Sequence, residues 1–297
     1  MPQGQPIAIE FRSSDDHHCL MKQSRHTLIS GKSLAALAIL SLAMAPLGPA
    51  SAAVGPNLVA HRAFYQMEMG DRQQTSAIVN INGRSAFAIE RDCTGWRSIE
   101  DYMIQFVAEN GGMDSVLSHF ESWESDSGDK YSFDIMEESS FEGRKDFGGF
   151  VQIDDSEVGN AYFTMAPDSA ISLPTGTLFP MRHVQKILKN AEAGEKIMAA
   201  TVFTGAEPDS ALMRTSTVVG GWREAPAGEL GTLGQDGYWQ INVAYFKPSS
   251  TAAEPEYEIA FSMQNNGLVR DYEINYGDFS ITANLTSAEP VASQECS

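Results

Sequence analysis

Apolar and polar residues alternate along most of the chain from Leu58 onward, and turn residues interrupt the alternation at regular intervals. Alternation with a period of two is the pattern of a β-strand with one buried face, and frequent turns are typical of antiparallel sheets. We therefore predict an all-β domain of more than about ten antiparallel strands. Besides the strands that flank the turns described next, the alternation predicts strands at residues 100–107, 148–153, 160–165, 196–204, 212–219, 239–246 and 278–285.

Three turns are predicted to join neighbouring strands into hairpins. Asn-Gly pairs, which favour the tight type I′ turn, occur at Asn82–Gly83 and at Asn266–Gly267. The third turn covers residues 126–129, where Asp, Ser, Gly and Asp follow one another. Each turn lies between arms of alternating apolar residues, so we expect a hairpin at each place.

One stretch, residues 181–193, instead has the apolar spacing of an α-helix. Val184 is followed by Ile187 and Leu188, three and four residues later, which places all three on one helix face. Gly194 can end the helix, because glycine readily adopts the left-handed conformation found just after helix ends. We predict one short helix within the otherwise all-β domain.

A secretion signal begins at Met21, some distance into the chain. Basic residues are followed by the apolar stretch Leu34–Ala45 and then by Ala-Ser-Ala at residues 50–52, which is an A-x-A cleavage site. The apolar stretch is about a dozen residues long, whereas a membrane-spanning helix needs roughly twenty. We therefore predict a cleaved signal peptide at residues 21–52. The mature product, residues 53–297, is then a single domain located in the periplasm.

Residues 1–20 precede this complete signal and have no periodicity of their own. We interpret them as a mis-assigned upstream start, which leaves Met1 and Met21 as the two candidate start residues. The alternative is a short cytosolic extension ahead of an uncleaved membrane anchor.

Two of the three cysteines belong to the predicted mature chain, Cys93 near its start and Cys296 next to the C-terminal residue. In an oxidising periplasm, an even number of cysteines favours a disulfide over free thiols. A redox-active pair usually has the spacing C-x-x-C, which this pair lacks. We predict a structural disulfide between Cys93 and Cys296.

Acidic residues outnumber basic residues by 39 to 20, which gives a formal net charge of −19 at pH 7. A protein with this charge is repelled by nucleic acids and by anionic lipid surfaces. We therefore expect no nucleic-acid partner.

Motifs for catalysis or metal binding are absent from the sequence. It has no H-E-x-x-H pair, no Cys/His cluster and no G-x-S-x-G motif, so we predict no metal and no cofactor. Carboxylates are abundant, and Glu121, Glu124 and Asp134 are candidates for an acid–base pair of the glycosidase type. The alternative function is therefore a hydrolase of envelope glycan or lipid that combines carboxylates with one histidine, chosen from His61, His119 and His183.

Aromatic residues are frequent on the alternating strands, and two interpretations fit them. They fill the interior of a curved sheet, or they line an elongated apolar cavity that binds a ligand. The motif LPTGTLFPMRH, residues 173–183, also has two interpretations: a turn into a capped helix, or a surface for a partner. The candidate ligand or partner residues are Trp96, Trp123, Thr177, Phe179, His183, Trp239 and Tyr245.

Several segments together resemble a known family. VAHRAFYQ, DCTGW, FESWES with KYSF, LPTGTLFPMRH, WQINVAYF and YEIAFSMQNNGLVRDYEINYGDFSITANL are similar, in order and spacing, to the EipB family of periplasmic cell-envelope integrity proteins of alphaproteobacteria. The resemblance extends from about residue 56 to Cys296. The upstream extension is the one departure from the family pattern.

This resemblance implies a β-spiral, in which a long antiparallel sheet wraps on itself like an incomplete, overlapping barrel with one helix at its edge. It also implies a disulfide at Cys93 and Cys296, in agreement with the cysteine count. The family is associated with envelope homeostasis and has no established catalytic activity. Its fold is similar to that of lipoprotein carriers and lipid-binding periplasmic proteins, which is an analogy between folds only.

We therefore expect a non-enzymatic periplasmic protein that maintains the envelope. It acts either by binding a lipid or other apolar envelope molecule, or by docking other periplasmic envelope proteins. A carrier should have a cavity lined by aromatic residues and methionines. A scaffold should have a filled core and an exposed apolar patch.

Overall fold

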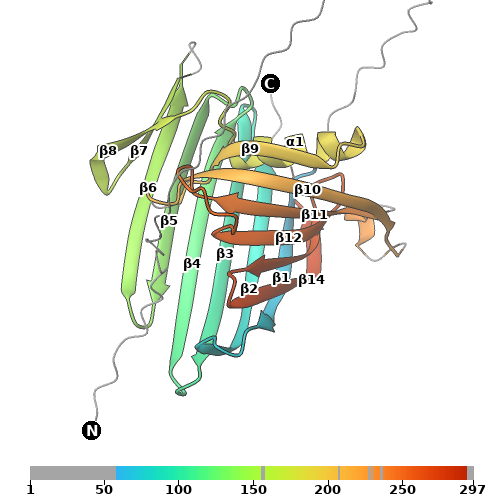
Figure 1. Ribbon diagram of the computed structural model, residues 1–297. Coiled ribbons are helices and arrows are strands. Elements are labelled where there is room, and N and C mark those ends of the chain that lie inside the picture. The colour runs from blue at the N-terminus through green and yellow to red at the C-terminus, as the bar shows by residue number, and fades with distance from the viewer. Residues whose placement is uncertain are drawn as a thin grey trace, which may run out of the picture. The chain divides into compact units, whose positions relative to one another are not determined.

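Among the residues that the structure describes, fourteen strands form one antiparallel sheet (Figure 1). This computed structural model describes residues 58–154, 158–206, 208–226, 228, 230–234 and 237–292. All of them belong to one compact unit, Val54–Ser297. The predicted extension, the predicted signal peptide and Cys296 lie outside the described residues, so these assignments and the disulfide stay predictions.

The first half of the chain supplies β1 (His61–Arg72), β2 (Ile78–Arg91), β3 (Gly95–Ala108), β4 (Met113–Ser125), β5 (Lys130–Ser139), β6 (Gly143–Ile153), β7 (Gly159–Phe163) and β8 (Ala166–Leu173). The helix α1 (Pro180–Glu192) follows. The second half supplies β9 (Ile197–Phe203), β10 (Leu212–Glu224), a short 3-10 helix η1 (Gly231–Leu233), β11 (Gly237–Phe246), β12 (Tyr257–Met263), β13 (Val269–Asn275) and β14 (Phe279–Pro290).

Neighbours in the sheet are neighbours in the chain except where β1 pairs with β14 and joins the two halves. The order is β8-β7-β6-β5-β4-β3-β2-β1-β14-β13-β12-β11-β10-β9. Several strands show the predicted alternation of burial. In β1, for example, Ala63, Tyr65 and Met67 are buried while the residues between them are more exposed. The all-β prediction is confirmed, because the described residues form one antiparallel sheet with a single α-helix.

The sheet wraps on itself without closing into a barrel. In Figure 1, β10, β11 and β12 lie in front of β2 and β3, and α1 lies beside β9. The segment that follows β8 reaches the opposite edge of the sheet at β9. There Leu178 donates its backbone N–H to the Thr201 carbonyl at 2.8 Å and accepts from Phe203 at 2.9 Å. The two ends of the sheet therefore overlap, which confirms the expected β-spiral.

Two of the three predicted hairpin turns are confirmed. Residues 126–129 join β4 to β5, with Gly128 at a φ of +71°. Asn266 and Gly267 join β12 to β13, with Gly267 at a φ of +88°. Glycine adopts this left-handed conformation without steric cost, which explains its place in both turns.

The hairpin predicted at Asn82–Gly83 is wrong, because both residues lie inside the continuous strand β2. Gly83 pairs with Met67 of β1 on one side and with Ile104 of β3 on the other. A Cβ atom at Gly83 would lie 2.7 Å from the Met103 carbonyl oxygen. The glycine thus permits a close approach of β3 to β2, which is its second common role in strands.

The helix α1 confirms the predicted helix within a residue at each end. Pro180 occupies the start of the helix, where its missing N–H costs nothing, and Gly194 follows the last turn with a φ of +79°. Ile187 and Leu188 on its buried face pack against Met198 of β9 and against core residues of β10 and β11.

Buried apolar residues form three clusters on the concave face of the sheet. The first lies under α1, against β10 to β12. The second lies between β1 to β3 and β14. The third lies between β5 to β8 and the β9 edge, where the rings of Tyr131 and Phe179 stack at 5.0 Å.

Candidate functional site

Five residues form a row across the concave face, one from each strand from β2 to β6. Cross-strand pairing places Phe87 opposite Glu100, Glu100 opposite Phe120, Phe120 opposite Ile135, and Ile135 opposite Phe147. We call this set the Glu100 row. All five residues are only half-buried, although they lie on the face that forms the core.

The Glu100 row connects the core clusters without being enclosed by them. Phe87 packs against the first and second clusters, whereas Phe120, Ile135 and Phe147 pack against the third. One carboxylate thus lies among four apolar side chains that keep part of their surface open. Half-exposed apolar side chains on a concave face are the usual lining of a ligand site.

Four tyrosines from β1, β3, β13 and the β13–β14 turn interact electrostatically with the Glu100 carboxylate: Tyr65, Tyr102, Tyr272 and Tyr276. Burial, and then the charge of nearby groups that include Glu100, raises the pKa of each tyrosine above its ordinary value. For Tyr276 the pKa rises to about 12. All four hydroxyls therefore stay protonated at neutral pH.

Hydrogen bonds hold three of these four tyrosines in place. Tyr65 donates to the Val269 carbonyl at 2.9 Å, and the Tyr272 hydroxyl lies 3.1 Å from the hydroxyl of Ser85. Tyr102 donates to a carboxylate oxygen of Glu137 at 3.4 Å. The rings of Tyr65 and Tyr272 meet edge to face at 5.4 Å. Their ring positions are thus set by the surrounding strands.

The Glu100 carboxylate itself has no partner within the described part of the chain. No described residue donates it a hydrogen bond, and no lysine, arginine or histidine there pairs with it. Burial raises the pKa of Glu100, and the neighbouring charge of Asp101 adds to the effect. A half-buried carboxylate without a partner destabilises a fold, so such a group calls for a functional explanation.

Glu124 lies on the same face of the neighbouring strand and is fully paired. Its carboxylate accepts the backbone N–H of Met181 at 2.8 Å and that of Arg182 at 3.0 Å, at the beginning of α1. It therefore caps a helix that lacks a cap from its own side chains. Burial raises the pKa of Glu124 to about 7, and the two backbone hydrogen bonds oppose this rise.

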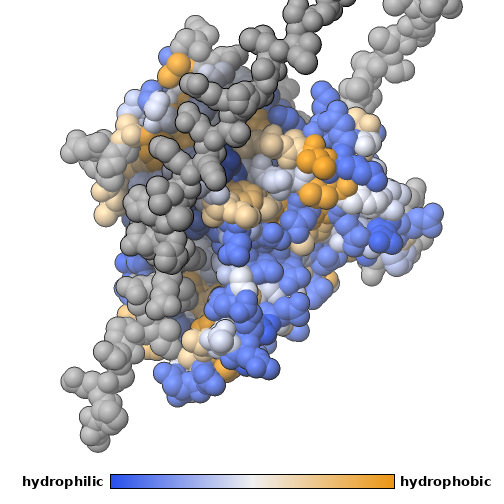
Figure 2. Space-filling view, viewed as in Figure 1, coloured by the Kyte–Doolittle hydropathy of each residue, from blue (hydrophilic) through white to orange (hydrophobic). Residues whose placement is uncertain are grey.

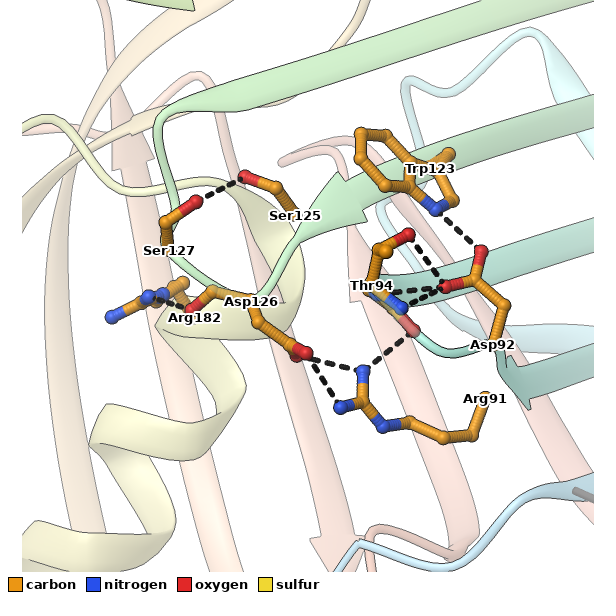
Figure 3. A network of polar contacts seen from close by, with 9 residues as sticks. Arg91, Asp92, Thr94, Trp123, Ser125, Asp126, Ser127 and Arg182 are labelled. Atoms are coloured by element: carbon orange, nitrogen blue, oxygen red, sulfur yellow. Dashed lines mark hydrogen bonds and ion pairs between the residues drawn. The ribbon is translucent and has the colours of Figure 1, made fainter. Parts of the chain in front are cut away.

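A polar network lies near this cap, where the β2–β3 turn meets the end of β4 (Figure 3). Arg182 donates to the Asp126 carbonyl, while the Asp126 carboxylate accepts both terminal nitrogens of Arg91 at 2.6 Å. Asp92 accepts the backbone N–H of Thr94 at 2.7 Å and the indole N–H of Trp123 at 2.8 Å. Each of these groups connects two elements, which makes this end of the molecule a structural junction.

The residues that sequence analysis proposed for a ligand or partner do not converge on one place. Trp96, Trp239 and Tyr245 all pack against the first core cluster on the concave face. Trp123 lies on the opposite face of β4, where Asp92 binds its indole. The motif residues lie in or before α1 and are buried, with little surface for a partner to touch: Thr177, Phe179 and His183.

Sequence analysis missed Glu100 and its tyrosines. One signal was present in the sequence. Glu100 lies on the same face of its strand as Tyr102, Ile104 and Phe106, so it takes a position that is otherwise apolar or aromatic. A carboxylate at that position points into the core side of the sheet. The other tyrosines come from distant strands, and only the pairing of β1 with β14 brings them together.

The residues of the hydrolase alternative divide between the two faces of the sheet. On the convex face, Glu121 lies two residues from His119 on β4 and opposite Asp134 of β5. His61 is buried with its Nδ1 2.7 Å from the Val59 carbonyl, and His183 is buried within α1. His119 pairs with Asp101 on the convex face at 2.7 Å. Of the carboxylates, Glu121 binds Arg97 on the convex face and Glu124 caps α1. In the described ranges, no three His, Cys, Asp or Glu residues gather to hold a metal.

A hollow of about 400 Å³ lies over β10 to β14 and is lined by polar and apolar residues. Asp271 and Glu273 contribute carboxylates, and the Ser262 hydroxyl donates to Asp271 at 3.0 Å. Hydrophilic residues predominate on the surface over β11, β12 and β14 (Figure 2). Within the described residues, no helix has the length and apolarity to span a membrane.

Comparisons with known proteins agree on a single family. A family profile described as EipB-like matches residues 52–292. The cell envelope integrity protein EipB of Brucella abortus (strain 2308) is 26% identical over 247 residues, which cover 82% of this chain and 88% of that protein. A crystal structure of a β-barrel-like protein of a domain of unknown function, from Brucella abortus, matches with a TM-score of 0.73 at 25% identity. That match covers 80% of this chain and 99% of the other.

Proposed function

This chain belongs to the EipB-like family, and we propose that it maintains the cell envelope by binding an apolar envelope molecule, without catalysing a reaction. The role in the envelope rests on the related cell envelope integrity protein. The predicted signal peptide would deliver the protein to the periplasm, where such molecules are found. The binding site is the concave face of the sheet.

One observation carries the binding proposal: the Glu100 row stays half-exposed on the face that elsewhere forms the core. Burying four large apolar side chains would stabilise the protein by roughly 1 kcal/mol or more for each. A ligand that covers the row supplies this burial. On the convex face, Glu121 is bound to Arg97 and His119 to Asp101, and this pairing favours binding over hydrolysis.

Docking of an envelope protein is the second candidate, and a different surface favours it. On the convex face of β6 and β7, the rings of Phe150 and Tyr162 stack at 5.1 Å while both stay exposed. Met165, just after β7, is 74% exposed. Exposed apolar residues that gather on one side commonly mark a protein interface.

Mass spectrometry of organic extracts tests the binding proposal. The mature protein is purified from a native periplasm and compared with a mock purification and with two variants of β4. We expect a stoichiometric apolar molecule with the wild type and with Leu117→Ala, whose side chain lies on the convex face. Phe120→Ala should lose most of it. A wild-type extract that matches the mock purification would reject binding and direct attention to the Phe150–Tyr162 surface.

A further inference from the structure

The Glu100 row combines a charged end and an apolar length. Glu100 is the second of its five residues, and Phe120, Ile135 and Phe147 continue the row over three further strands. With strands about 4.8 Å apart, this apolar part extends roughly 14 Å from the carboxylate. A ligand that fits the row therefore has an apolar chain and a polar group at one end.

The surroundings of Glu100 select the charge of that polar group. A carboxylate attracts cations, and the faces of tyrosine rings attract them as well. Four tyrosine rings lie close enough to Glu100 to feel its charge. Tyr102 also contacts a second carboxylate, Glu137, on the same face. An anionic group placed here would meet two carboxylates and no described basic partner.

We propose that the concave face binds an amphiphile with a cationic amine head group, which sits against the Glu100 carboxylate beside the half-buried Tyr102, Tyr272 and Tyr276 while its apolar chain covers Phe120, Ile135 and Phe147. This inference rests on the proposed function, because it names the class of the apolar molecule. The amine supplies the partner that the carboxylate lacks.

The long-range electrostatics of the protein act in the same direction. The chain carries a net charge of −19, which favours the approach of cationic ligands and disfavours anionic ones. Glu124, by contrast, is unavailable to a ligand because two backbone N–H groups of α1 already occupy its carboxylate. Unlike Glu124, Glu100 is thus a carboxylate of this face that a head group can reach.

Titration with amphiphiles that differ only in head group tests the proposal. Isothermal calorimetry on the mature protein, from which bound lipid has been removed, compares dodecyltrimethylammonium, dodecyl maltoside and dodecanoate below their micelle concentrations. We expect the cationic probe to bind at least about tenfold more tightly than the others, which corresponds to about 1.4 kcal/mol. Equal affinity for all three, or preference for dodecanoate, would overturn the inference.

Two variants separate this inference from the proposed function. Glu100→Gln should remove the preference for the cationic probe and keep binding of dodecyl maltoside. Its matched control is Asp101→Asn, which makes the same change of charge one residue away on the convex face. Asp101→Asn should keep the preference for the cationic probe. If this variant also loses the preference, net charge alone explains it. If no probe binds the wild type, the proposed function fails as well. Thermal unfolding of both variants confirms that they are folded.

Discussion

Two carboxylates on the same face of neighbouring strands differ in their hydrogen bonding. Glu124 of β4 accepts two backbone N–H groups of α1, whereas Glu100 of β3 accepts no hydrogen bond from the described residues. Burial disfavours the charged form of both, and it raises the pKa of both. Two backbone hydrogen bonds partly offset the effect of burial at Glu124, and no described hydrogen bond does so at Glu100. The difference separates a residue that holds the fold from one that, as we propose, binds a ligand.

The surroundings of the two carboxylates differ in the same way. Near Glu124, charged groups pair across element boundaries, as Arg91 does with Asp126. Near Glu100, hydrogen bonds fix the tyrosine rings but leave the carboxylate unpaired. Aromatic side chains that are already fixed near an unpaired charge favour binding. The ligand then does not have to order them, so binding costs less conformational entropy.

Removal of the Glu124 side chain should give the largest loss of stability. In Glu124→Ala, the N–H groups of Met181 and Arg182 lose their acceptor within a buried site. We expect the free energy of unfolding to fall by about 2 to 4 kcal/mol, measured by urea denaturation. The control is Glu121→Ala on the convex face of the same strand, which should lose less than about 1 kcal/mol with its exposed ion pair to Arg97. Equal losses in the two variants would mean that the cap is not structural.

The pH dependence of stability should follow the ionisation of Glu124. The unfolded chain releases this proton near pH 4.5 and the folded protein at about 7. The contribution of Glu124 to stability is therefore complete below pH 4.5 and is lost as the pH rises through 7, by on the order of 2 to 3 kcal/mol. Between roughly pH 5 and pH 8, the wild type should therefore lose more stability than Glu124→Gln does, as measured by thermal unfolding.

His183 contributes in the opposite direction, because burial lowers its pKa to about 4. Its contribution is lost as the pH falls below 6.5, in the wild type and in Glu124→Gln alike. The difference between the two proteins therefore isolates Glu124. Parallel curves for the two would show that the carboxylate titrates as it does in water.

Local sequence pattern was sufficient to predict α1, which Glu124 caps, and the two strands that carry Glu100 and Glu124. Alternation with period two persists along β3 and β4, and the spacing of Val184, Ile187 and Leu188 indicates α1. These signals depend on residues close in the chain, so one sequence suffices to predict them. The wrapping of the sheet came from the family resemblance, because the pairing of β1 with β14 leaves no local pattern.

The misplaced hairpin and the missed site have one physical cause. Asn82 and Gly83 form a good turn sequence, but pairing with β1 and β3 on both sides keeps β2 extended. Likewise, the phase of Glu100 within its strand could have been noticed, but its lack of a partner is a property of the assembled fold. The crosslink between Cys93 and Cys296 remains a prediction.

Replacement of Glu100 should have a smaller effect on stability, and of the opposite sign. Glu100→Gln removes a charge that has no described partner, so the free energy of unfolding should stay unchanged or rise by up to about 2 kcal/mol. The gain should increase with pH, since burial makes the ionised form the costly one. A marked loss of stability in urea denaturation would show that Glu100 supports the fold as Glu124 does.

Removal of a tyrosine hydroxyl should have the smallest effect on stability. The same variants distinguish the contribution of the ring to ligand binding from that of the hydroxyl. Tyr272 is half-buried, and Tyr272→Phe removes the hydrogen bond between its hydroxyl and that of Ser85, which should cost about 1 kcal/mol of stability. Its ring remains, so affinity for dodecyltrimethylammonium should be unchanged, because aromatic faces attract the cation without the hydroxyl. Tyr272→Leu, which removes the ring, should weaken that affinity by several-fold. If Tyr272→Phe weakens binding as much as Tyr272→Leu, the hydroxyl contacts the ligand, and the tyrosines act as hydrogen-bonding groups rather than as an aromatic enclosure around the cation.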